Sequence, residues 1–253
     1  QNFNLSLGQT REMRSILFKL GWQQVAPFQT YVYPLRPGRM LKGKLNPIVA
    51  GPTGAGLQLR QFAKQVRVQG KTVTLQTRLV DRFESRHDQL WHEVKGGYPC
   101  AVVRDSSYLN WKYVDQPGQD YVRVEMLDQG KVVAVAVLLV RDPADNSPYQ
   151  YRRAFVVDLV VSPSDKNLVL SVLECIRQHC LQLEADAVVF ELINEKLEAH
   201  LQDYGFIKRD PMRFFLVYAQ GSEDGVHEKL MSSSNWLVTK GDSDVDRPEG
   251  GVK

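Results

Sequence analysis

Hydrophobic and polar positions along the chain predict an alternation of helices and strands. In the segment 11–25, apolar residues at helical spacing are followed by Gly21, which predicts an amphipathic helix that ends at this glycine. Apolar runs and period-two alternation predict strands elsewhere, and apolar residues three and four positions apart predict further helices. The predicted strands are 30–35, 72–80, 121–127, 131–141, 155–161, 187–193, 213–219 and 236–239, and the predicted helices are 81–94, 106–113, 169–180 and 195–204.

The connections between these elements predict a mixed sheet. Asp128, Gln129 and Gly130 give a turn signal, so strands 121–127 and 131–141 are expected to form a hairpin. Two largely apolar strands, 155–161 and 187–193, enclose a helix, which predicts a βαβ crossover with parallel strands. The predicted fold class is therefore mixed α/β, with a central sheet flanked by helices.

A constant offset of 184 residues superposes the beginning of the chain on its later part. The order helix, glycine, aromatic residue, proline and aromatic-rich strand is the same in both places. The matched pairs are Leu17 with Leu201, Gly21 with Gly205, Trp22 with Phe206, Pro27 with Pro211 and Tyr31 with Phe215. This repeat predicts that 1–35 is the end of one domain, 36–70 a Pro/Gly-rich linker, 71–240 a second domain and 241–253 an acidic tail. The alternative is coincidence between two ordinary helix–glycine–strand connections.

Composition narrows the class of protein. With 253 residues, 43% hydrophobic and 24% charged, the chain is expected to be globular rather than disordered or fibrous. Its longest apolar stretch, 132–140, has nine residues, whereas a bilayer-spanning helix needs about 20. Three cysteines without a CxxC pair argue against a disulfide framework or a zinc ribbon, so we expect a reducing, cytoplasmic setting.

The net charge of +3 conceals an asymmetry along the chain. No acid lies between Met13 and Val80, where there are eleven bases, whereas 81–253 carries 20 bases and 28 acids. Within the basic part, segment 57–67 has the spacing of a short helix with one apolar and one basic face, the latter formed by Arg60, Lys64 and Arg67. We expect this helix to dock the first domain on the acidic second one, with an anionic membrane surface as the alternative. Nucleic acid is not expected as a partner, because stacking aromatics are not interleaved with the bases.

One spacing resembles a known family. Asn194 is followed by ten residues and then by Gly205-Phe206, at the end of a strand–helix unit. This spacing and the order of elements over 71–240 resemble the GNAT superfamily of acyl-CoA-dependent N-acyltransferases. Segment 1–35 is similar to the tail of a preceding copy, as in a tandem GNAT. Segments 105–111 and 235–244 are similar to bacterial GNAT-like proteins linked to exopolysaccharide biosynthesis.

The resemblance implies a donor site for acetyl-CoA at the loop after strand 155–161, where a helix N-terminus receives the pyrophosphate. The residues that would line it are Leu159, Val161, Ser162, Lys166, Asn167 and Asn194. Val169 and Ser171 stand where the family has glycines, and Asp165 adds a negative charge. A plain capped crossover helix is therefore an equal alternative. Asn194 is expected either to bond the pantetheine arm or to cap the helix that begins at Glu195.

The resemblance also implies a catalytic carboxylate, Asp158, in the otherwise apolar strand 155–161. Apolar surroundings raise the pKa of a carboxyl group, which suits a base that works near neutral pH. The alternative is a structural ion pair with Arg152, Arg153 or Lys112. The family's tyrosine acid corresponds to Leu201, and Tyr204 faces a different direction, so the acid role stays unassigned.

The implied function is transfer of an acyl group, in the first place acetyl, from coenzyme A to an amine acceptor such as a sugar precursor. The alternative is a catalytically silent GNAT-like module that binds a partner. No metal is expected: Glu84, His87 and His92 are interpreted as exposed helix residues, and the alternating acids from Asp242 onward as part of the tail.

Overall fold

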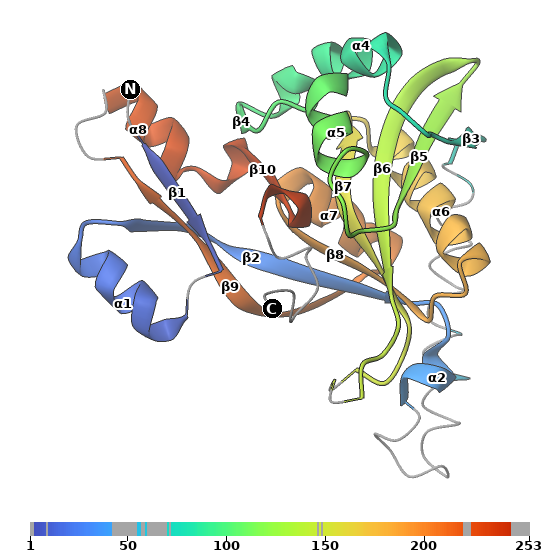
Figure 1. Ribbon diagram of the computed structural model, residues 1–253, viewed down its shortest axis with the longest axis horizontal. Helices are drawn as coiled ribbons and strands as arrows, with labels where there is room; N and C mark the ends of the chain where they lie inside the picture. Colours follow the sequence, from blue (N-terminus) through green and yellow to red (C-terminus); the bar gives the residue numbers. More distant parts are fainter. Residues whose placement is uncertain are drawn as a thin grey trace.

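The computed structural model describes residues 3–8, 10–41, 55–56, 59, 70, 72–145, 147, 149–219 and 224–243. Its elements alternate between helices and strands along the chain (Figure 1). The strands are β1 (Asn4–Leu7), β2 (Gln23–Pro34), β3 (Gln76–Leu79), β4 (Cys100–Ala101), β5 (Tyr121–Asp128), β6 (Lys131–Arg141), β7 (Arg153–Val161), β8 (Ala187–Ile193), β9 (Ile207–Tyr218) and β10 (Trp236–Thr239). The helices are α1 (Arg11–Lys19), α2 (Pro37–Leu41), α4 (Ser85–Val94), α5 (Ser106–Tyr113), α6 (Lys166–Gln182), α7 (Glu195–Tyr204) and α8 (Asp224–Met231), with short 3-10 turns η1 (Lys95–Gly97), η2 (Ser233–Asn235) and η3 (Lys240–Asp242).

The strands form one mixed sheet in the order β1-β9-β2-β8-β7-β6-β5-β3, with β10 added to β8 and β4 added to β10. Strands β5 and β6 are an antiparallel hairpin, and β7 and β8 are parallel neighbours joined through α6. Helices α4 and α5 lie in front of the sheet in Figure 1, and α6 and α7 lie behind it. The predicted hairpin, βαβ crossover and mixed α/β class are confirmed.

The predicted strand at 30–35 is the end of a longer strand. Strand β2 begins at Gln23 and runs antiparallel to β8 and β9, between them. Strand β9 likewise begins at Ile207 rather than at 213. Both were predicted too short because polar residues and a proline interrupt the apolar pattern. The β2–β9 ladder accommodates these residues through two register irregularities, between Gln24 and Ala26 and between Phe28 and Thr30.

The two segments related by the offset of 184 residues share a local structure. Helix α1 ends before Gly21, whose φ is +86°, and α7 ends before Gly205, whose φ is +124°. Each glycine leads into a twelve-residue strand, β2 or β9. A positive φ at this position favours glycine, which explains the match. Strand β2 of segment 1–35 is part of the central sheet, where it pairs with both β8 and β9. Its origin in a preceding copy stays a prediction.

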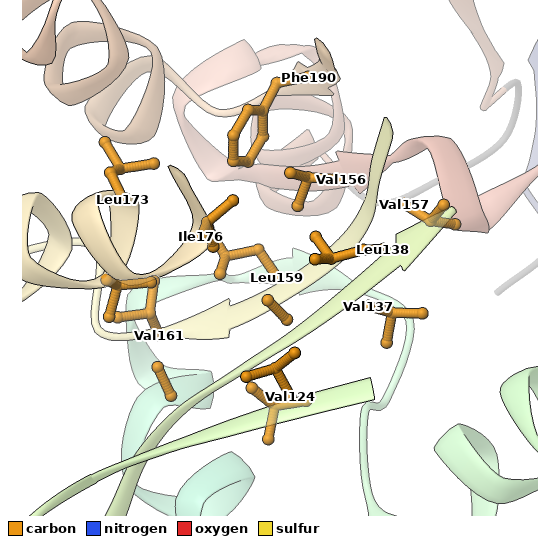
Figure 2. Close-up of a cluster of buried hydrophobic side chains, with 14 of the residues drawn as sticks. Val124, Val137, Leu138, Val156, Val157, Leu159, Val161, Leu173, Ile176 and Phe190 are labelled. Carbon is orange, nitrogen blue, oxygen red and sulfur yellow. The ribbon is translucent and has the colours of Figure 1, made fainter. Parts of the chain in front are cut away.

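The main hydrophobic core lies between the centre of the sheet and its helices. Figure 2 shows Leu138 of β6, Val156 and Leu159 of β7, and Leu173 and Ile176 of α6 lying together in this core. Strand β6 is buried over most of its length, which explains its continuous run of apolar residues. The three cysteines are free.

Two predictions from the sequence concern a membrane and the helix expected at 57–67. Among the helices of the described residues, none is both long and apolar enough to cross a bilayer. The predicted amphipathic helix at 57–67, apart from Leu59, lies outside the described residues. Its docking partner stays a prediction.

Candidate functional site

The two central parallel strands diverge halfway along their length. Pairing between β7 and β8 extends from Arg153↔Ala187 to Val156↔Phe190 and stops there. Directly after this point β7 carries a bulge, because Val137 of β6 pairs with Asp158 and the next residue, Leu138, pairs with Val156. The extra residue, Val157, bends β7 away from β8. The divergence of β7 and β8 is called the splay below.

A small cavity lies in the splay. It measures about 10 Å³, which is room for about one water molecule. Most of its lining is apolar, and its polar lining residues are Asp158, Glu191 and Thr239. The apolar residues come from β7, β8, α6 and α7: Val156, Leu159, Val169, Leu173, Phe190, Leu192, Leu197 and Leu201.

Asp158 is buried at the edge of this cavity and engaged through both carboxylate oxygens. Its Oδ1 accepts hydrogen bonds from Arg104 Nε at 2.9 Å, from the backbone N–H of Leu159 at 2.9 Å and from the Thr239 hydroxyl at 3.2 Å. Its Oδ2 accepts a hydrogen bond from the Tyr113 hydroxyl at 2.9 Å. The bulge at Val157 sets the direction of this side chain. The ion-pair interpretation is therefore realised in this structure, but with Arg104.

Two of the three partners considered from the sequence have other contacts. Arg152 pairs with Asp142 at 2.8 Å, and Arg153 stacks on two aromatic rings. The ion pair of Asp158 joins two residues that are 54 positions apart. No local pattern in the sequence connects them, which explains why Arg104 was missed.

Arg104 is fully buried and joins three parts of the fold. Besides Asp158, it binds Asp242 Oδ2 at 2.6 Å and the carbonyl of Val102 at 2.8 Å. Burial by itself lowers the pKa of Arg104, but the charges of Asp158 and Asp242 outweigh it and raise that pKa well above its usual value. Burial raises the pKa of Asp242, and the attraction of Arg104 opposes this rise. The cluster holds two carboxylates and one guanidinium, and Asp242 Oδ1 is buried without a hydrogen-bond partner.

Residues 236–242, called the closing segment below, fill the splay beside β8. Val238 and Thr239 pair with Ile193 and Leu192 where β7 no longer does. Lys240 Nζ bonds Glu191 at 2.7 Å, the other acid of the cavity. In Figure 1, β10 and η3 lie against the middle of the sheet, next to β7 and β8.

Gly241 makes the close approach of the closing segment possible. A Cβ atom at this position would lie 2.0 Å from the Tyr113 hydroxyl oxygen and 3.2 Å from the carbonyl oxygen of Val157. The acidic tail predicted for 241–253 begins with Gly241 and Asp242; in the structure Gly241 is buried, and the Asp242 side chain is only 7% exposed. Residues 244–253 lie outside the described part.

The N-terminus of α6 has the geometry of a capped helix. The Asp165 carboxylate accepts a hydrogen bond from the backbone N–H of Leu168 at 3.0 Å, where an anion would otherwise bind. Lys166 forms an ion pair with Asp203 of α7. The carbonyl of Asn167 accepts a hydrogen bond from Ser171, which is buried. In this conformation the Leu168 N–H and the Lys166 ammonium are both engaged by carboxylates of the protein itself.

The remaining residues predicted for the donor site lie around the splay. Leu159 lines the cavity, and Ser162 follows the end of β7. Val161 is buried, and its carbonyl accepts a hydrogen bond from the Tyr98 hydroxyl at 2.7 Å. The structure thus brings Asp158, Leu159 and the neighbourhood of Asn194 together, whereas Lys166 and Asn167 lie at the helix start.

Asn194 caps α7, as one of its two interpretations proposed. Its Oδ1 accepts a hydrogen bond from the backbone N–H of Leu197 at 3.0 Å. Its Nδ2 donates to the carbonyl of Trp236 at 3.0 Å, so the same side chain also holds the closing segment. Both ends of the amide are therefore used within the protein.

Two side chains considered for the acid role differ in position. Leu201 lines the cavity, whereas the Tyr204 hydroxyl donates to Glu174 of α6 at 2.6 Å. Burial is the main cause that raises the pKa of Tyr204. The hydroxyls that contact Asp158 belong instead to Tyr113 and Thr239, which sequence reasoning did not select.

His87 was interpreted as an exposed helix residue, and this is wrong. Its ring is buried, and its Nδ1 accepts a hydrogen bond from the backbone N–H of Glu84 at 2.8 Å at the start of α4. Its Nε2 lies 3.2 Å from Glu125 of β5. Within the described residues, no group of three or more His, Cys, Asp or Glu side chains is arranged to hold a metal ion.

Comparison with known proteins identifies a similar fold but no matching family. No family model matches the chain, and no curated protein does. Among solved structures, a GCN5-related N-acetyltransferase from Anabaena variabilis aligns with a TM-score of 0.50 at 11% identity, over 84% of this chain and 45% of that one. A conserved protein of Enterococcus faecalis, described as a probable N-acyltransferase, aligns with a TM-score of 0.47 at 8% identity, over 85% and 44%.

A third solved structure is the C-terminal domain of a putative lysylphosphatidylglycerol synthetase from Agrobacterium fabrum. It aligns with a TM-score of 0.38 at 13% identity, over 90% of this chain and 70% of that one. The chain spans about half the length of the first two structures. The match to the Anabaena protein shows a GNAT-like fold, and at this identity it shows the fold alone.

Proposed function

We propose that this chain transfers an acyl group, acetyl in the simplest case, from coenzyme A to an amine acceptor at the splay. The supporting observation is an apolar cavity between two diverging parallel strands, with a buried carboxylate, Asp158, on its edge. An acyl chain needs an apolar channel, and attack by an amine needs a nearby group that takes up a proton.

The donor needs more room than the described conformation offers. A cavity of about 10 Å³ is far smaller than the pantetheine arm of coenzyme A. The proposed function therefore requires the closing segment to move away from β8. That movement removes the Thr239 hydroxyl from Asp158 Oδ1 and Asp242 from Arg104, because both belong to the closing segment.

In the proposed reaction, Asp158 takes up the proton that the acceptor amine loses as its nitrogen bonds to the acyl carbon. Arg104 orients this carboxylate through its Nε–H. The hydrogen bonds from Arg104, Leu159 and Tyr113 hold both oxygens of Asp158 in a fixed orientation. Transfer through a bridging water would suit this arrangement. The residue that protonates the leaving thiolate stays unassigned.

The acceptor and the rest of the parent protein belong to the same proposal. We propose an amine on a sugar precursor in polysaccharide assembly as acceptor, on the strength of the sequence resemblance of segments 105–111 and 235–244. We also propose that 1–35 is the tail of a preceding GNAT-like unit. The match of α1, Gly21 and β2 with α7, Gly205 and β9 supports this, as does the absence of any buried residue in α1.

Calorimetric titration with acetyl-CoA tests the donor, combined with hydrogen exchange. On binding, the amide of Val238 should exchange faster, because the pairing of the closing segment with β8 opens. The β5–β6 hairpin serves as an internal control and should not change. Absence of binding at millimolar acetyl-CoA, in this chain and in a variant with a weakened closing segment, would contradict the acyltransferase proposal.

A catalytically silent module is the second candidate. Two observations favour it: the closing segment fills the splay, and Asp165 caps the helix start where pyrophosphate would bind. A silent module predicts that opening the closing segment destabilises the protein without creating affinity for acetyl-CoA.

A further inference from the structure

A half-buried arginine on the sheet has no counter-ion among the residues that the structure describes. The guanidinium carbon of Arg153, the first residue of β7, lies 4.6 Å from the ring centre of Tyr149 and 5.0 Å from that of Phe155. Its Nε is buried without a hydrogen-bond partner. Among the described residues, no carboxylate lies within ion-pair distance of this guanidinium. Its neighbour Arg152, by contrast, pairs with Asp142.

The two aromatic rings attract the guanidinium through cation–π interactions. Such contacts restrict the side chain but do not accept hydrogen bonds from its N–H groups as a carboxylate or phosphate oxygen does. Burying an unpaired charge is costly in free energy. Directly opposite in the β6–β7 ladder stands Arg141, and like charges at such a position are destabilising. Folding alone does not account for this arrangement, whereas an anion bound beside Arg153 would.

Further positive groups surround Arg153 on the same face of the sheet. Arg209 of β9 lies opposite Thr30 of β2, and Thr30 lies opposite Glu191 of β8, so Arg209 is on the same face of the sheet as Glu191. Burial raises the pKa of Tyr151, and the charges of Arg153 and Arg209 both act to lower it. Lys240 lies over the Phe155 ring at 4.7 Å. Lys240 and Arg213 share one acid, Glu191, at 2.7 Å and 3.6 Å. We call Arg153, Arg209, Arg213 and Lys240 the arginine patch.

We propose that the arginine patch binds the phosphate group of a small molecule, held chiefly by Arg153 and Arg209. A phosphate has several acceptor oxygens and can receive hydrogen bonds from more than one guanidinium, which makes arginine well suited to it. The preorganised stack of Arg153 lowers the conformational cost of binding. The inference does not depend on acyl transfer, because Arg153 and Arg209 take no part in the proposed reaction and the site needs no movement of the closing segment.

Titration with inorganic phosphate and pyrophosphate tests the proposal, at an ionic strength held constant with sodium chloride. Wild-type protein should bind at least one of these probes saturably. Arg153→Met and Arg209→Met should each weaken binding about 10-fold or more, because each removes a charge-assisted hydrogen bond. Lys208→Met is the matched control and should leave the affinity unchanged. It is exposed and adjacent to Arg209, but it faces the other side of the sheet, opposite Tyr31, whose hydroxyl bonds Glu198 of α7.

Several results would overturn the proposal. One is the absence of saturable binding of both probes. Another is an equal loss of affinity in Lys208→Met, which would indicate diffuse charge instead of a site. Binding to phosphatidylglycerol vesicles without binding of either small anion would assign the patch to a membrane surface and also overturn it. If Arg153→Met fails to fold, as judged by circular dichroism, Arg209→Met decides the question, because Arg209 is exposed.

Discussion

Replacing Arg104 by methionine tests the buried charge cluster most directly. The substitution keeps a long apolar side chain and removes the guanidinium that binds Asp158 Oδ1 at 2.9 Å and Asp242 Oδ2 at 2.6 Å. Two carboxylates then face each other in the interior without a positive partner. Breaking a buried ion pair by removing one partner costs about 3–5 kcal/mol. Whole domains are stable by only about 5–15 kcal/mol, so Arg104→Met should lose a large part of the total.

The loss should depend on pH, with a sign that follows from Asp242. Burial raises the pKa of Asp242 in the folded state, so the folded protein binds this proton more tightly than the unfolded chain does. Such a carboxyl group favours folding at low pH, and this contribution is lost as the pH rises through its folded pKa. Removing Arg104 takes away the attraction that opposes the rise. The stability difference between wild type and Arg104→Met should therefore be larger at pH 8 than at pH 5.

Urea denaturation at both pH values measures this difference. A rescue variant, Arg104→Met with Asp158→Asn and Asp242→Asn, removes the uncompensated charges and should recover part of the loss, because apolar or neutral replacement of a buried cluster is far less costly than breaking it. A matched control is Arg82→Met, which removes an exposed arginine paired with Asp115 and should cost about 1 kcal/mol or less. A cost for Arg104→Met no larger than that of the control, or no rescue, would refute the reasoning.

The other predictions concern the neighbours of this cluster. Gly241→Ala should destabilise the protein by about 1–3 kcal/mol, because the new Cβ atom would lie 2.0 Å from the Tyr113 hydroxyl oxygen. Thermal melts should show a smaller loss of stability when Tyr113 is also replaced by Phe. An equal loss in both backgrounds would mean that the clash is not with the Tyr113 hydroxyl. Asn194→Ala should lower the free energy of unfolding, measured with urea, by about 1–2 kcal/mol through loss of the α7 cap. Hydrogen exchange at Val238 should accelerate, because the carbonyl of Trp236 loses its bond to the Asn194 amide. Unchanged exchange would show that Asn194 caps α7 but does not hold the closing segment. If acyl transfer occurs, steady-state kinetics should show that Asp158→Asn lowers kcat with little change in KM for the donor, whereas a folded variant with full activity would assign Asp158 to structure alone.

Local patterns in the sequence were sufficient for the centre of the fold. The hairpin of β5 and β6 follows from two apolar strands around Asp128-Gln129-Gly130, and the structure has positive φ at Gln129 and Gly130. The parallel pair β7 and β8 follows from two buried strands that enclose an amphipathic helix. Both predictions depend only on neighbours in the chain, which is why periodicity was enough.

The parts that depend on distant residues were not predictable in the same way. Strand β1 was missed because it has only four residues, which are half-exposed or exposed and lie on the edge of the sheet. Asp158 was identified as an unusual carboxylate in an apolar strand, but its partner Arg104 belongs to another part of the chain. Asp242 was grouped with the acids that follow it, because composition does not reveal that the preceding residues 236–239 add a strand to β8.

The energy that holds the closing segment decides how donor affinity must be interpreted. Trp236, Leu237 and Val238 are all buried, and each such side chain contributes about 1.5–3 kcal/mol in hydrophobic stabilisation. If opening exposes these side chains only in part and costs about 4 kcal/mol, a donor that binds the open form with a Kd of about 1 μM binds the chain with an apparent Kd of about 1 mM. A weak affinity of this chain for acetyl-CoA is therefore compatible with the acyltransferase proposal, and a failure to detect binding to this chain alone does not distinguish it from the silent module. A variant with a weakened closing segment distinguishes the two proposals. Under the acyltransferase proposal, its apparent affinity for acetyl-CoA must increase by the same factor as the equilibrium constant for opening. Under the silent proposal, the variant only becomes less stable and still binds no donor.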